Sequence, residues 1–259
     1  MPDMNVGGAG DTLDVQNDLL VLISGESGMG KSASLKDIPD KERWIYANCE
    51  AGKRPPFKAT WYGGETRGSV ITDPFQVHEA LDFATGNPEI DGVIIDTATM
   101  LMEMFESRYI VGAADTMKGW ANYAQFWKNL MQQKVAAVNK PVIILGHVKD
   151  EFDEAAGIIR RSVPVKGSLK NNGIEAYFST VVSAKRLDLK KLKGFENDLL
   201  VITDEELDLG FKHVFQTRIT KDTVGERIRA PMGMFPKAMT YIDNDAMRLM
   251  NHIRAFYGA

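Results

Sequence analysis

The sequence has almost no cysteine and no long hydrophobic run. Cys49 is the only cysteine among 259 residues, which excludes an internal disulfide framework and fits a reducing compartment. No apolar run approaches the roughly 20 residues that a membrane-spanning helix requires. Positive charge is not in excess either, because 31 Lys and Arg residues oppose 35 Asp and Glu residues, for a formal net charge of −4. If the protein binds nucleic acid, it must do so through a local basic patch.

The N-terminal segment, residues 1–18, lacks the charged and apolar regions of a signal peptide. It is rich in glycine and aspartate, so we predict a flexible leader and a cytoplasmic protein without membrane contact. Hydrophobic residues make up 44% of the chain and charged residues 25%, which is ordinary for a globular protein. Residues 19–259 show no internal repeat and no clear second domain. We therefore predict one domain with a sizeable core.

Short apolar segments bounded by turn residues predict buried parallel strands. Helical spacing of apolar residues predicts helices between them. We expect strands at residues 19–23, 44–48, 93–96, 141–145 and 180–184, and helices at residues 31–38, 74–84 and 120–138, after residue 96 and from residue 243 to the end. Strands that alternate with helices predict an α/β fold with a mainly parallel central sheet flanked by helices.

Three further segments interrupt this alternation. Residues 213–219 and 226–230 alternate in polarity around the turn at residues 222–225, which predicts a C-terminal β-hairpin before the last helix. Residues 150–173 are polar and basic, and we expect a long loop there. Residues 187–210 are rich in charge, and their pattern does not assign a structure.

A complete phosphate-loop motif, G-x-x-x-x-G-K-[ST], follows the first strand. Glycines let the backbone wrap closely enough for its amides to point at phosphate oxygens, and the helix that follows adds positive potential. In this motif the lysine contacts the β- and γ-phosphates and the serine ligates magnesium. An ordinary glycine-rich turn is the alternative, but the strand before and the helix after are the required context. We expect nucleotide contacts from Gly25, Glu26, Ser27, Gly28, Met29, Gly30, Lys31, Ser32 and Ala33.

Asp96 ends a strand of β-branched residues and is our candidate for the carboxylate that partners the phosphate loop. The carboxyl ends of parallel strands share one sheet edge, so Asp96 is placed to hold Mg²⁺ together with Ser32. A strand-terminal or helix-capping aspartate is the alternative. A phosphate loop that binds a magnesium nucleotide needs such a carboxylate, which favours the functional interpretation.

Hydrolysis also needs a group that orients or deprotonates water. Glu50, at the end of the second strand, is our first candidate, with an ordinary surface glutamate as an equal alternative on spacing alone. His147 follows the fourth strand and could sense the γ-phosphate, although spacing alone favours a histidine satisfied by local hydrogen bonds. Cys49 has no evident base beside it, so we interpret it as a core residue.

Two groups of basic residues are candidates for phosphate contacts. The segment at residues 150–173 could follow a nucleic-acid backbone, although a solvated loop explains its charges as well. Its cations are Arg160, Arg161, Lys166 and Lys170. The predicted hairpin carries a second group that could reach the nucleotide of a neighbouring subunit, or simply pair across strands. Its cations are Arg218, Lys221, Arg227 and Arg229.

The order of these elements resembles the RecA-like core of P-loop NTPases. More narrowly, it is similar to the phage-encoded RecA-like ATPases of Sak-type single-strand-annealing systems. The likeness spans residues 19–230, and its motifs lie at residues 92–97, 142–151, 166–168 and 177–178. It implies that Glu50 is the catalytic glutamate and that His147 is a sensor on a strand between the phosphate loop and Asp96.

The same resemblance implies a DNA-binding and oligomeric protein. Residues 150–173 correspond to the second DNA-binding loop and the segment after Asp96 to the first. Arg218 and Lys221 fall where the family places residues that act in trans across a subunit interface. His147 departs from the family, since RecA itself has glutamine there. Residues 187–210 have no counterpart, and the extra terminal DNA-handling domain of full recombinases is missing, which favours a helper role over independent strand exchange.

From these features we predict a magnesium-dependent, DNA-stimulated ATPase in the host cytoplasm of a phage. It would bind ATP, Mg²⁺ and single-stranded DNA and assist annealing or homologous recombination. We expect a homo-oligomer, ring or filament, with a single-strand-binding or annealing protein as a further partner. A P-loop kinase of a nucleotide or small metabolite is the alternative, with residues 150–173 as its lid. A nucleotide-gated assembly module without hydrolysis is the third hypothesis.

Overall fold

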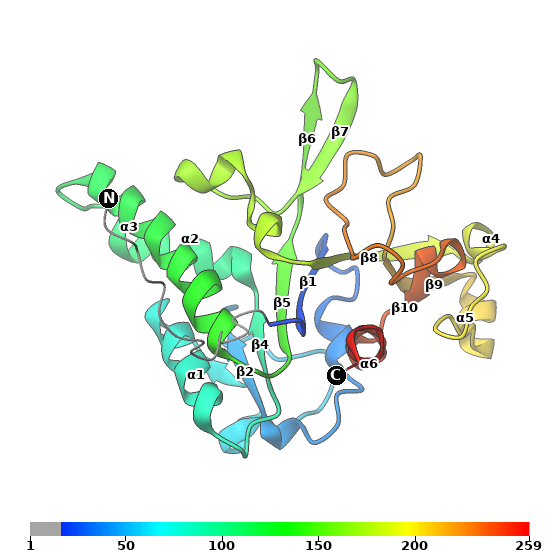
Figure 1. The fold of residues 1–259 in the computed structure, drawn as a ribbon, viewed down its shortest axis with the longest axis horizontal. Helices are drawn as coiled ribbons and strands as arrows, with labels where there is room; N and C mark the ends of the chain where they lie inside the picture. Colours follow the sequence, from blue (N-terminus) through cyan, green and yellow to red (C-terminus); the bar gives the residue numbers. More distant parts are fainter. Residues whose placement is uncertain (1–16, 259) are drawn as a thin grey trace, which may run out of the picture.

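The computed structural model describes residues 17–258, so nearly all of the predicted leader, residues 1–18, lies outside the described residues. Its centre is one eight-stranded sheet (Figure 1). The strands are β1 (Leu20–Gly25), β2 (Trp44–Asn48), β3 (Ser69–Val70), β4 (Gly92–Asp96), β5 (Val142–His147), β8 (Thr180–Asp188), β9 (Phe211–Gln216) and β10 (Tyr241–Asp243). Their order across the sheet is β10-β9-β8-β1-β5-β4-β2-β3. The strands from β3 to β8 in this order run parallel, and β9 and β10 are antiparallel to their neighbours.

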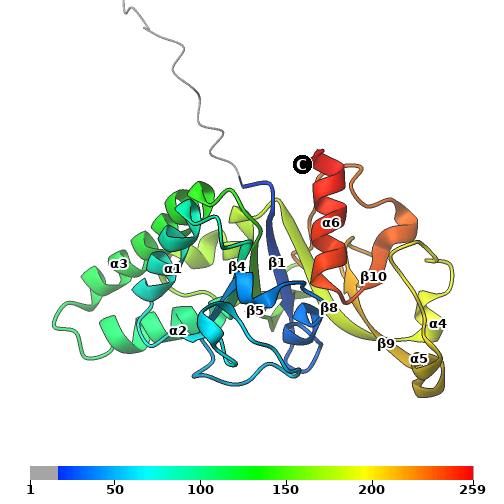
Figure 2. The same cartoon turned by 90° about the horizontal axis from the view of Figure 1, so that it is seen from below.

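Helices cover both faces of this sheet (Figure 2). On one face lie α1 (Phe75–Gly86), α2 (Ala98–Tyr109) and α3 (Thr116–Asn129), which continues into a π-helical segment at Leu130–Val135. On the other face lie α6 (Ala246–Tyr257) and the short 3-10 helix Ser32–Leu35. Because both faces are covered, each strand buries both sets of side chains, as in β2, where Ile45 packs into one core and Trp44 into the other. The predicted α/β fold with a mainly parallel sheet flanked by helices is confirmed.

The register of the central strands brings the predicted site residues to one edge. Gly25 at the end of β1 is paired with His147 at the end of β5, and Asn48 at the end of β2 is paired with Asp96 at the end of β4. Strand β5 lies between β1 and β4, which is the position that the RecA-like resemblance predicts for the strand of His147. Helix α2 begins directly after this edge, with Thr97 as its N-cap.

The predicted pairing of the C-terminal hairpin is wrong, although antiparallel strands and a final helix do close the fold. Strand β9 pairs with β8 and β10, and residues 226–230 form only isolated bridges, from Glu226 to Arg161 and from Arg229 to Val181. Alternating polarity indicates a strand but not its partner. Here β8 runs on beyond β1 and offers β9 a long edge.

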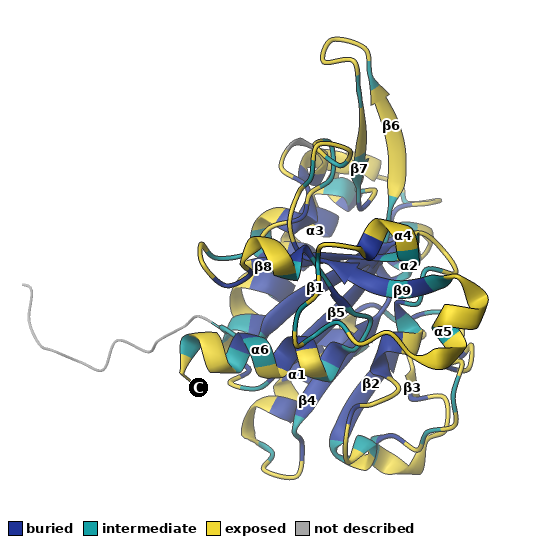
Figure 3. Ribbon diagram, turned by 90° about the vertical axis from the view of Figure 1, so that its right-hand side faces the viewer, coloured by how far each residue is buried: buried dark blue, intermediate teal, exposed yellow. Residues whose placement is uncertain are grey.

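The predicted loop at residues 150–173 contains regular structure. Strands β6 (Lys149–Asp153) and β7 (Ile158–Ser162) form an antiparallel hairpin that projects from the body with both faces exposed (Figure 3). Because neither face is buried, the sequence shows no alternation of apolar and polar residues there. Residues 187–210 contain two short helices, α4 (Leu189–Leu192) and α5 (Asp204–Leu209). Among the described residues, every helix is too short or too polar to cross a membrane.

Candidate nucleotide-binding site

The phosphate loop, residues 25–32, connects β1 to the 3-10 helix that starts at Ser32. Two of its glycines are required by their surroundings. A Cβ atom at Gly25 would lie 2.8 Å from the carbonyl oxygen of Ala184. Gly30 has φ +93°, and a Cβ there would lie 2.6 Å from Nδ2 of Asn244. The loop therefore takes a path that residues with a side chain cannot follow.

Lys31 is buried at the centre of this loop. Its Nζ donates to the carbonyl oxygens of Gly25 and Glu26 at 2.9 and 2.8 Å, and it lies 3.2 Å from Nδ1 of His147. Burial lowers the pKa of Lys31 to about 8, although the negative charges of Asp96 and Glu50 oppose this shift. The ammonium is thus held by three acceptors at the end of β1 and β5.

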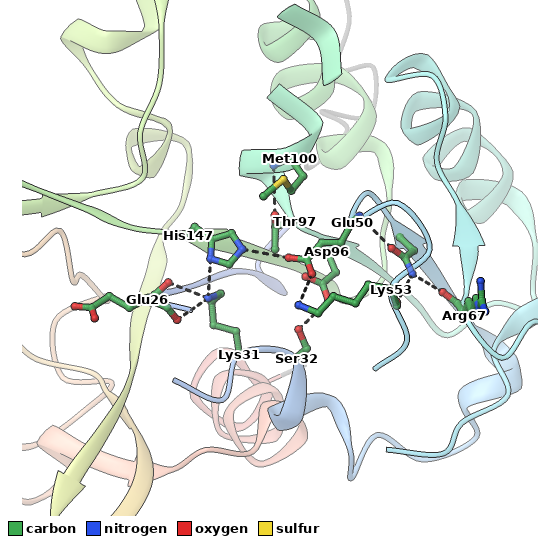
Figure 4. A network of polar contacts seen from close by, with 12 residues as sticks. Glu26, Lys31, Ser32, Glu50, Lys53, Arg67, Asp96, Thr97, Met100 and His147 are labelled. Atoms are coloured by element: carbon green, nitrogen blue, oxygen red, sulfur yellow. Dashed lines mark hydrogen bonds and ion pairs between the residues drawn. The ribbon is translucent and has the colours of Figure 1, made fainter. Parts of the chain in front are cut away.

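A hydrogen-bonded chain leads from Lys31 to Glu50 (Figure 4). Nε2 of His147 lies 3.1 Å from Oε1 of Glu50, whose Oε2 accepts from Nζ of Lys53 at 2.9 Å. An ammonium can only donate, so Nδ1 of His147 accepts and its Nε2–H donates to Glu50. The bond from His147 lowers the pKa of Glu50 to about 2 against the effect of burial, and Lys53 acts in the same direction. Glu50 is therefore an ionised carboxylate at the mouth of the site.

Asp96 is buried and holds two hydroxyl groups on one oxygen. Its Oδ2 accepts from Oγ of Ser32 at 2.9 Å and from the phenol of Tyr46 at 2.5 Å. Tyr46 is itself fixed, because its ring stacks on Trp61 with centroids 4.8 Å apart. Burial raises the pKa of Asp96, while the two hydrogen bonds and Lys31 counteract this. Oδ1 of Asp96 is buried without a hydrogen-bond partner among residues 17–258.

The oxygen ligands of this pair fit Mg²⁺. A hydroxyl and a carboxylate with one unpartnered oxygen are hard donors, and Mg²⁺ in nucleotide sites takes one or two protein ligands beside phosphates and water. The described residues contain no cluster of three or more His, Cys, Asp or Glu side chains that could hold a metal by themselves. A metal shared with substrate phosphates is consistent with both observations.

A cavity of about 360 Å³ lies over the phosphate loop. The predicted residues that line it are Ser27, Gly28, Gly30, Lys31, Ser32, Ala33, Glu50, Asp96 and His147. Glu26 and Met29 instead line a second cavity on the other side of the loop, together with Gly25. The structure thus brings most, but not all, of the predicted nucleotide contacts into one cavity.

Sequence reasoning missed several residues of this cavity. Tyr46 and Lys53 line the cavity and lie within four residues of Glu50 in the chain. Their closeness to this candidate is the sequence feature that could have identified them. His213 and Asn244 come from β9 and from the residue after β10, and no local pattern marks them. The side-chain amide of Asn244 donates to the carbonyl oxygen of Gly30 at 2.9 Å.

The predicted DNA-binding cations lie outside this cavity. Two are on strand β7 of the hairpin, and two follow it in the chain. Arg161 pairs with Asp150 at 2.7 Å and with Glu26 of the phosphate loop at 2.8 Å, and it lies 3.7 Å from Glu226. Arg160 pairs with Asp153 at 2.6 Å, and Lys166 pairs with Glu106. Lys170 is exposed and has no ion pair within residues 17–258. Only Lys170 therefore keeps its charge unopposed.

Neither of the predicted trans residues lines the cavity over the phosphate loop. Arg218 donates to the carbonyl oxygen of Phe235 at 2.7 Å and lines a separate cavity of about 340 Å³. Lys221 is exposed on the connection that follows β9. Thr220 and Asp222, the neighbours of Lys221 in the chain, line the second cavity together with Gly25 and Glu26. Contact of the two cations with the nucleotide of a neighbouring subunit stays a prediction.

Comparison with known proteins gives little beyond the geometry. No family model matches the chain, and no curated protein matches it. Among solved structures, the crystal structure of the RadB recombinase is similar with a TM-score of 0.38 and 14% identity, over 66% of this chain and 76% of that chain. A likeness at this level carries no argument about function, so the fold rests on the strand order and register described above.

Proposed function

We propose that this protein is a magnesium-dependent ATPase with a RecA-like core, folded as one domain, that binds single-stranded DNA. In this proposal it assists annealing or homologous recombination as a homo-oligomer in the cytoplasm of a phage host. One observation carries the proposal: the Ser32–Asp96 pair and the chain from Lys31 through His147 to Glu50 meet in one cavity over a phosphate loop.

Each of these residues supports a step of phosphate hydrolysis. Glu50 is ionised and oriented by two donors, so it can accept a proton from an attacking water. Lys31 supplies positive charge where charge develops on the γ-phosphate. Bound Mg²⁺ would neutralise phosphate charge, and Ser32 and Asp96 would hold it. His147 links Lys31 to Glu50, so a change at the lysine reaches the base through one imidazole ring.

The cavity favours hydrolysis over transfer to a small acceptor. A kinase needs a mobile lid that closes over its nucleotide, and residues 150–173 were the sequence candidate for it. Among the described residues, that segment supplies none of the cavity lining, and its hairpin projects away from the body. Glu50 instead occupies the cavity wall as an ionised carboxylate, which suits activation of water.

The hairpin also offers a surface for DNA that differs from the predicted one. Residues 149–162 carry four carboxylates and three cations, so net charge alone does not attract a phosphate backbone. Phe152, however, is 67% exposed and lies opposite the exposed Ile159. Base stacking on an aromatic ring contributes roughly 1–3 kcal/mol per base. We propose that Phe152 stacks on bases while Lys170 and the ends of Arg160, Arg161 and Lys166 contact phosphates.

The proposed homo-oligomer would place cations of one subunit at the nucleotide of the next. Arg218 and Lys221 would stabilise the transition state in the active site of a neighbouring subunit, as an arginine finger does. A single-strand-binding or annealing protein is the expected further partner on DNA.

Phosphate release from ATP, measured with and without single-stranded DNA, tests this function. We expect magnesium-dependent release that DNA stimulates, with no phosphorylated product other than ADP and phosphate. Transfer of the γ-phosphate to a nucleoside or metabolite would establish the kinase instead. Nucleotide-dependent assembly without any turnover by the wild-type protein would establish a non-hydrolysing module.

A further inference from the structure

The segment at residues 201–209, here called the acidic segment, exposes apolar side chains to an unusual degree. Leu207 is 60% exposed and Leu209 is 54% exposed, and Val201 and Ile202 are exposed beside them. Leu207 and Leu209 belong to α5, whereas Val201 and Ile202 lie in the irregular segment before it. Thr203 caps the start of α5 and forms a capping box with Glu206. The capping box, the bond from the amide of Val201 to Asp243 and the ion pair of Glu206 with Lys212 therefore hold the segment through polar contacts, while its apolar side chains stay exposed.

Its carboxylates are also exposed and unopposed. Asp204, Glu205 and Asp208 have no ion pair within residues 17–258. Glu206 differs from them, because it completes the cap and pairs with Lys212 at 2.7 Å. The acidic segment thus combines four exposed apolar side chains with three unpaired negative charges. Figure 3 shows α5 coloured as exposed. Exposed apolar side chains beside unpaired charges make this segment a candidate interaction surface.

A second surface of the same chain has the complementary character. It is here called the basic patch and surrounds the cavity of about 340 Å³. Met232 is 97% exposed at its rim, with Ile219 exposed nearby. Arg218 and Arg229 line this cavity and are exposed. Lys221 is exposed on the connection between them, beside the exposed Asp222, and we include it in the basic patch. None of the three cations has an ion pair among the described residues.

Strand β9 separates these two surfaces. The acidic segment ends just before its first residue, Phe211, and the basic patch begins just after its last residue, Gln216. Six residues of strand span roughly 20 Å, so the two surfaces do not meet within one subunit. A contact between unlike surfaces of identical chains is heterologous, and it builds a ring or a filament.

We propose that the acidic segment of one copy docks on the basic patch of the next copy of this chain. The exposed leucines of α5 would enter the cavity beside Met232. The three carboxylates would face Arg229 and lie in the positive field of Arg218 and Lys221, which would stay free to reach the nucleotide. This interface would explain how two subunits share one active site. It rests on the proposed function only in its expected effect on ATP turnover. Residue His213 of β9 lines the nucleotide cavity, so docking at the adjacent α5 brings Arg218 and Lys221 of the neighbour towards that cavity.

Charge reversal with complementation tests this interface. One variant carries Glu205→Lys and Asp208→Lys, and the other carries Lys221→Glu and Arg229→Glu. Sedimentation velocity with ATP, Mg²⁺ and single-stranded DNA measures association of each alone and of their mixture. We expect each variant alone to associate at least about tenfold more weakly than wild type, because like charges then face each other. The mixture should recover most of the wild-type association, because every interface in an alternating assembly again pairs opposite charges.

Recovery in the mixture also shows that both variants are folded. A control with Glu79→Lys and Glu89→Lys reverses two exposed carboxylates elsewhere and should associate like wild type. Wild-type-like association of the single variants, or failure of the mixture to recover, overturns the interface. A wild-type protein that stays monomeric under these conditions also overturns it. Association that follows the charges without ATP turnover would instead leave the interface standing and remove the proposed function.

Discussion

The sheet edge that carries the phosphate loop, Asp96 and His147 is here called the phosphate edge. This edge and the region after β9 use charge in opposite ways. At the phosphate edge, Lys31 and Asp96 are buried, and fixed hydrogen bonds orient them. Beyond β9, Lys221 and Arg229 are exposed and held by no ion pair in the described part of the chain. Buried groups in fixed positions act through geometry, whereas exposed groups act through summed charge and area. Substitutions at the edge should therefore change rates steeply, and substitutions on the surface should change association gradually.

Lys31→Ala gives the largest expected effect. It removes the cation that three acceptors orient in the loop, so we expect loss of most nucleotide-dependent activity in a protein that remains folded. Phosphate release and thermal unfolding measure the two properties. Lys36→Ala, an exposed lysine just past the loop, is the matched control. ATP hydrolysis at the wild-type rate by Lys31→Ala would remove the phosphate-loop assignment.

Glu50→Gln separates chemistry from binding at the same edge. The amide keeps the shape of the side chain but cannot take a proton, so turnover should fall by about 10² or more. Nucleotide affinity, measured by titration with a fluorescent analogue, should stay close to wild type. Normal turnover in this variant would place the base elsewhere. Glu65→Gln, on the exposed segment after β2, should behave as wild type.

His147→Ala should shift the pH dependence of turnover. The hydrogen bond from His147 is the main cause of the low pKa of Glu50, and burial acts in the opposite direction. Without that bond the pKa of Glu50 rises, so the carboxylate is protonated at a higher pH and the acidic limb of the rate profile moves upwards. A limb at the same pH in both proteins would mean that Glu50 is not the titrating base.

Tyr46→Phe tests whether Asp96, the carboxylate of the proposed metal site, needs its second donor. Removing the phenol takes away one of two hydrogen bonds to Oδ2 of Asp96 while the stacked ring remains. A lost hydrogen bond to a charged group costs about 1.5–3 kcal/mol, so the Mg²⁺ concentration for half-maximal nucleotide binding should rise about tenfold or more. Nucleotide binding without Mg²⁺ should not change. Tyr123→Phe, in the core on the other face, is the control.

Neutralising cations at and after the β6–β7 hairpin should have the smallest effect, which is on the affinity for single-stranded DNA. Arg160→Ala with Lys170→Ala should weaken single-stranded DNA binding only several-fold at low salt. Each lost phosphate contact should flatten the slope of log affinity against log salt by about 0.7. Lys190→Ala with Lys193→Ala removes two exposed charges near α4 as a control. An unchanged slope in the first variant would move the DNA site away from these cations.

Sequence alone predicts the phosphate edge better than the outer region, for physical reasons. The motif at residues 25–32 is contiguous, and parallel strands bring their carboxyl ends together whatever the rest of the chain does. Tyr46, His213 and Asn244 enter the cavity through tertiary packing that no local pattern records. The ion pairs of Arg161 are a second example, because Glu26 lies 135 positions earlier in the chain. The hairpin at residues 149–162 was missed because neither of its faces is buried.

The bond from Asn244 to Gly30 has a consequence for how the protein is made. It joins the phosphate loop to a residue 214 positions later, next to the last strand of the sheet. A nascent chain leaves the ribosome from its N-terminus, so the motif is synthesised long before the side chain that holds it. Such distant contacts form late because loop closure must precede them. Acquisition of nucleotide affinity during translation would therefore report the completion of the chain rather than the emergence of the motif.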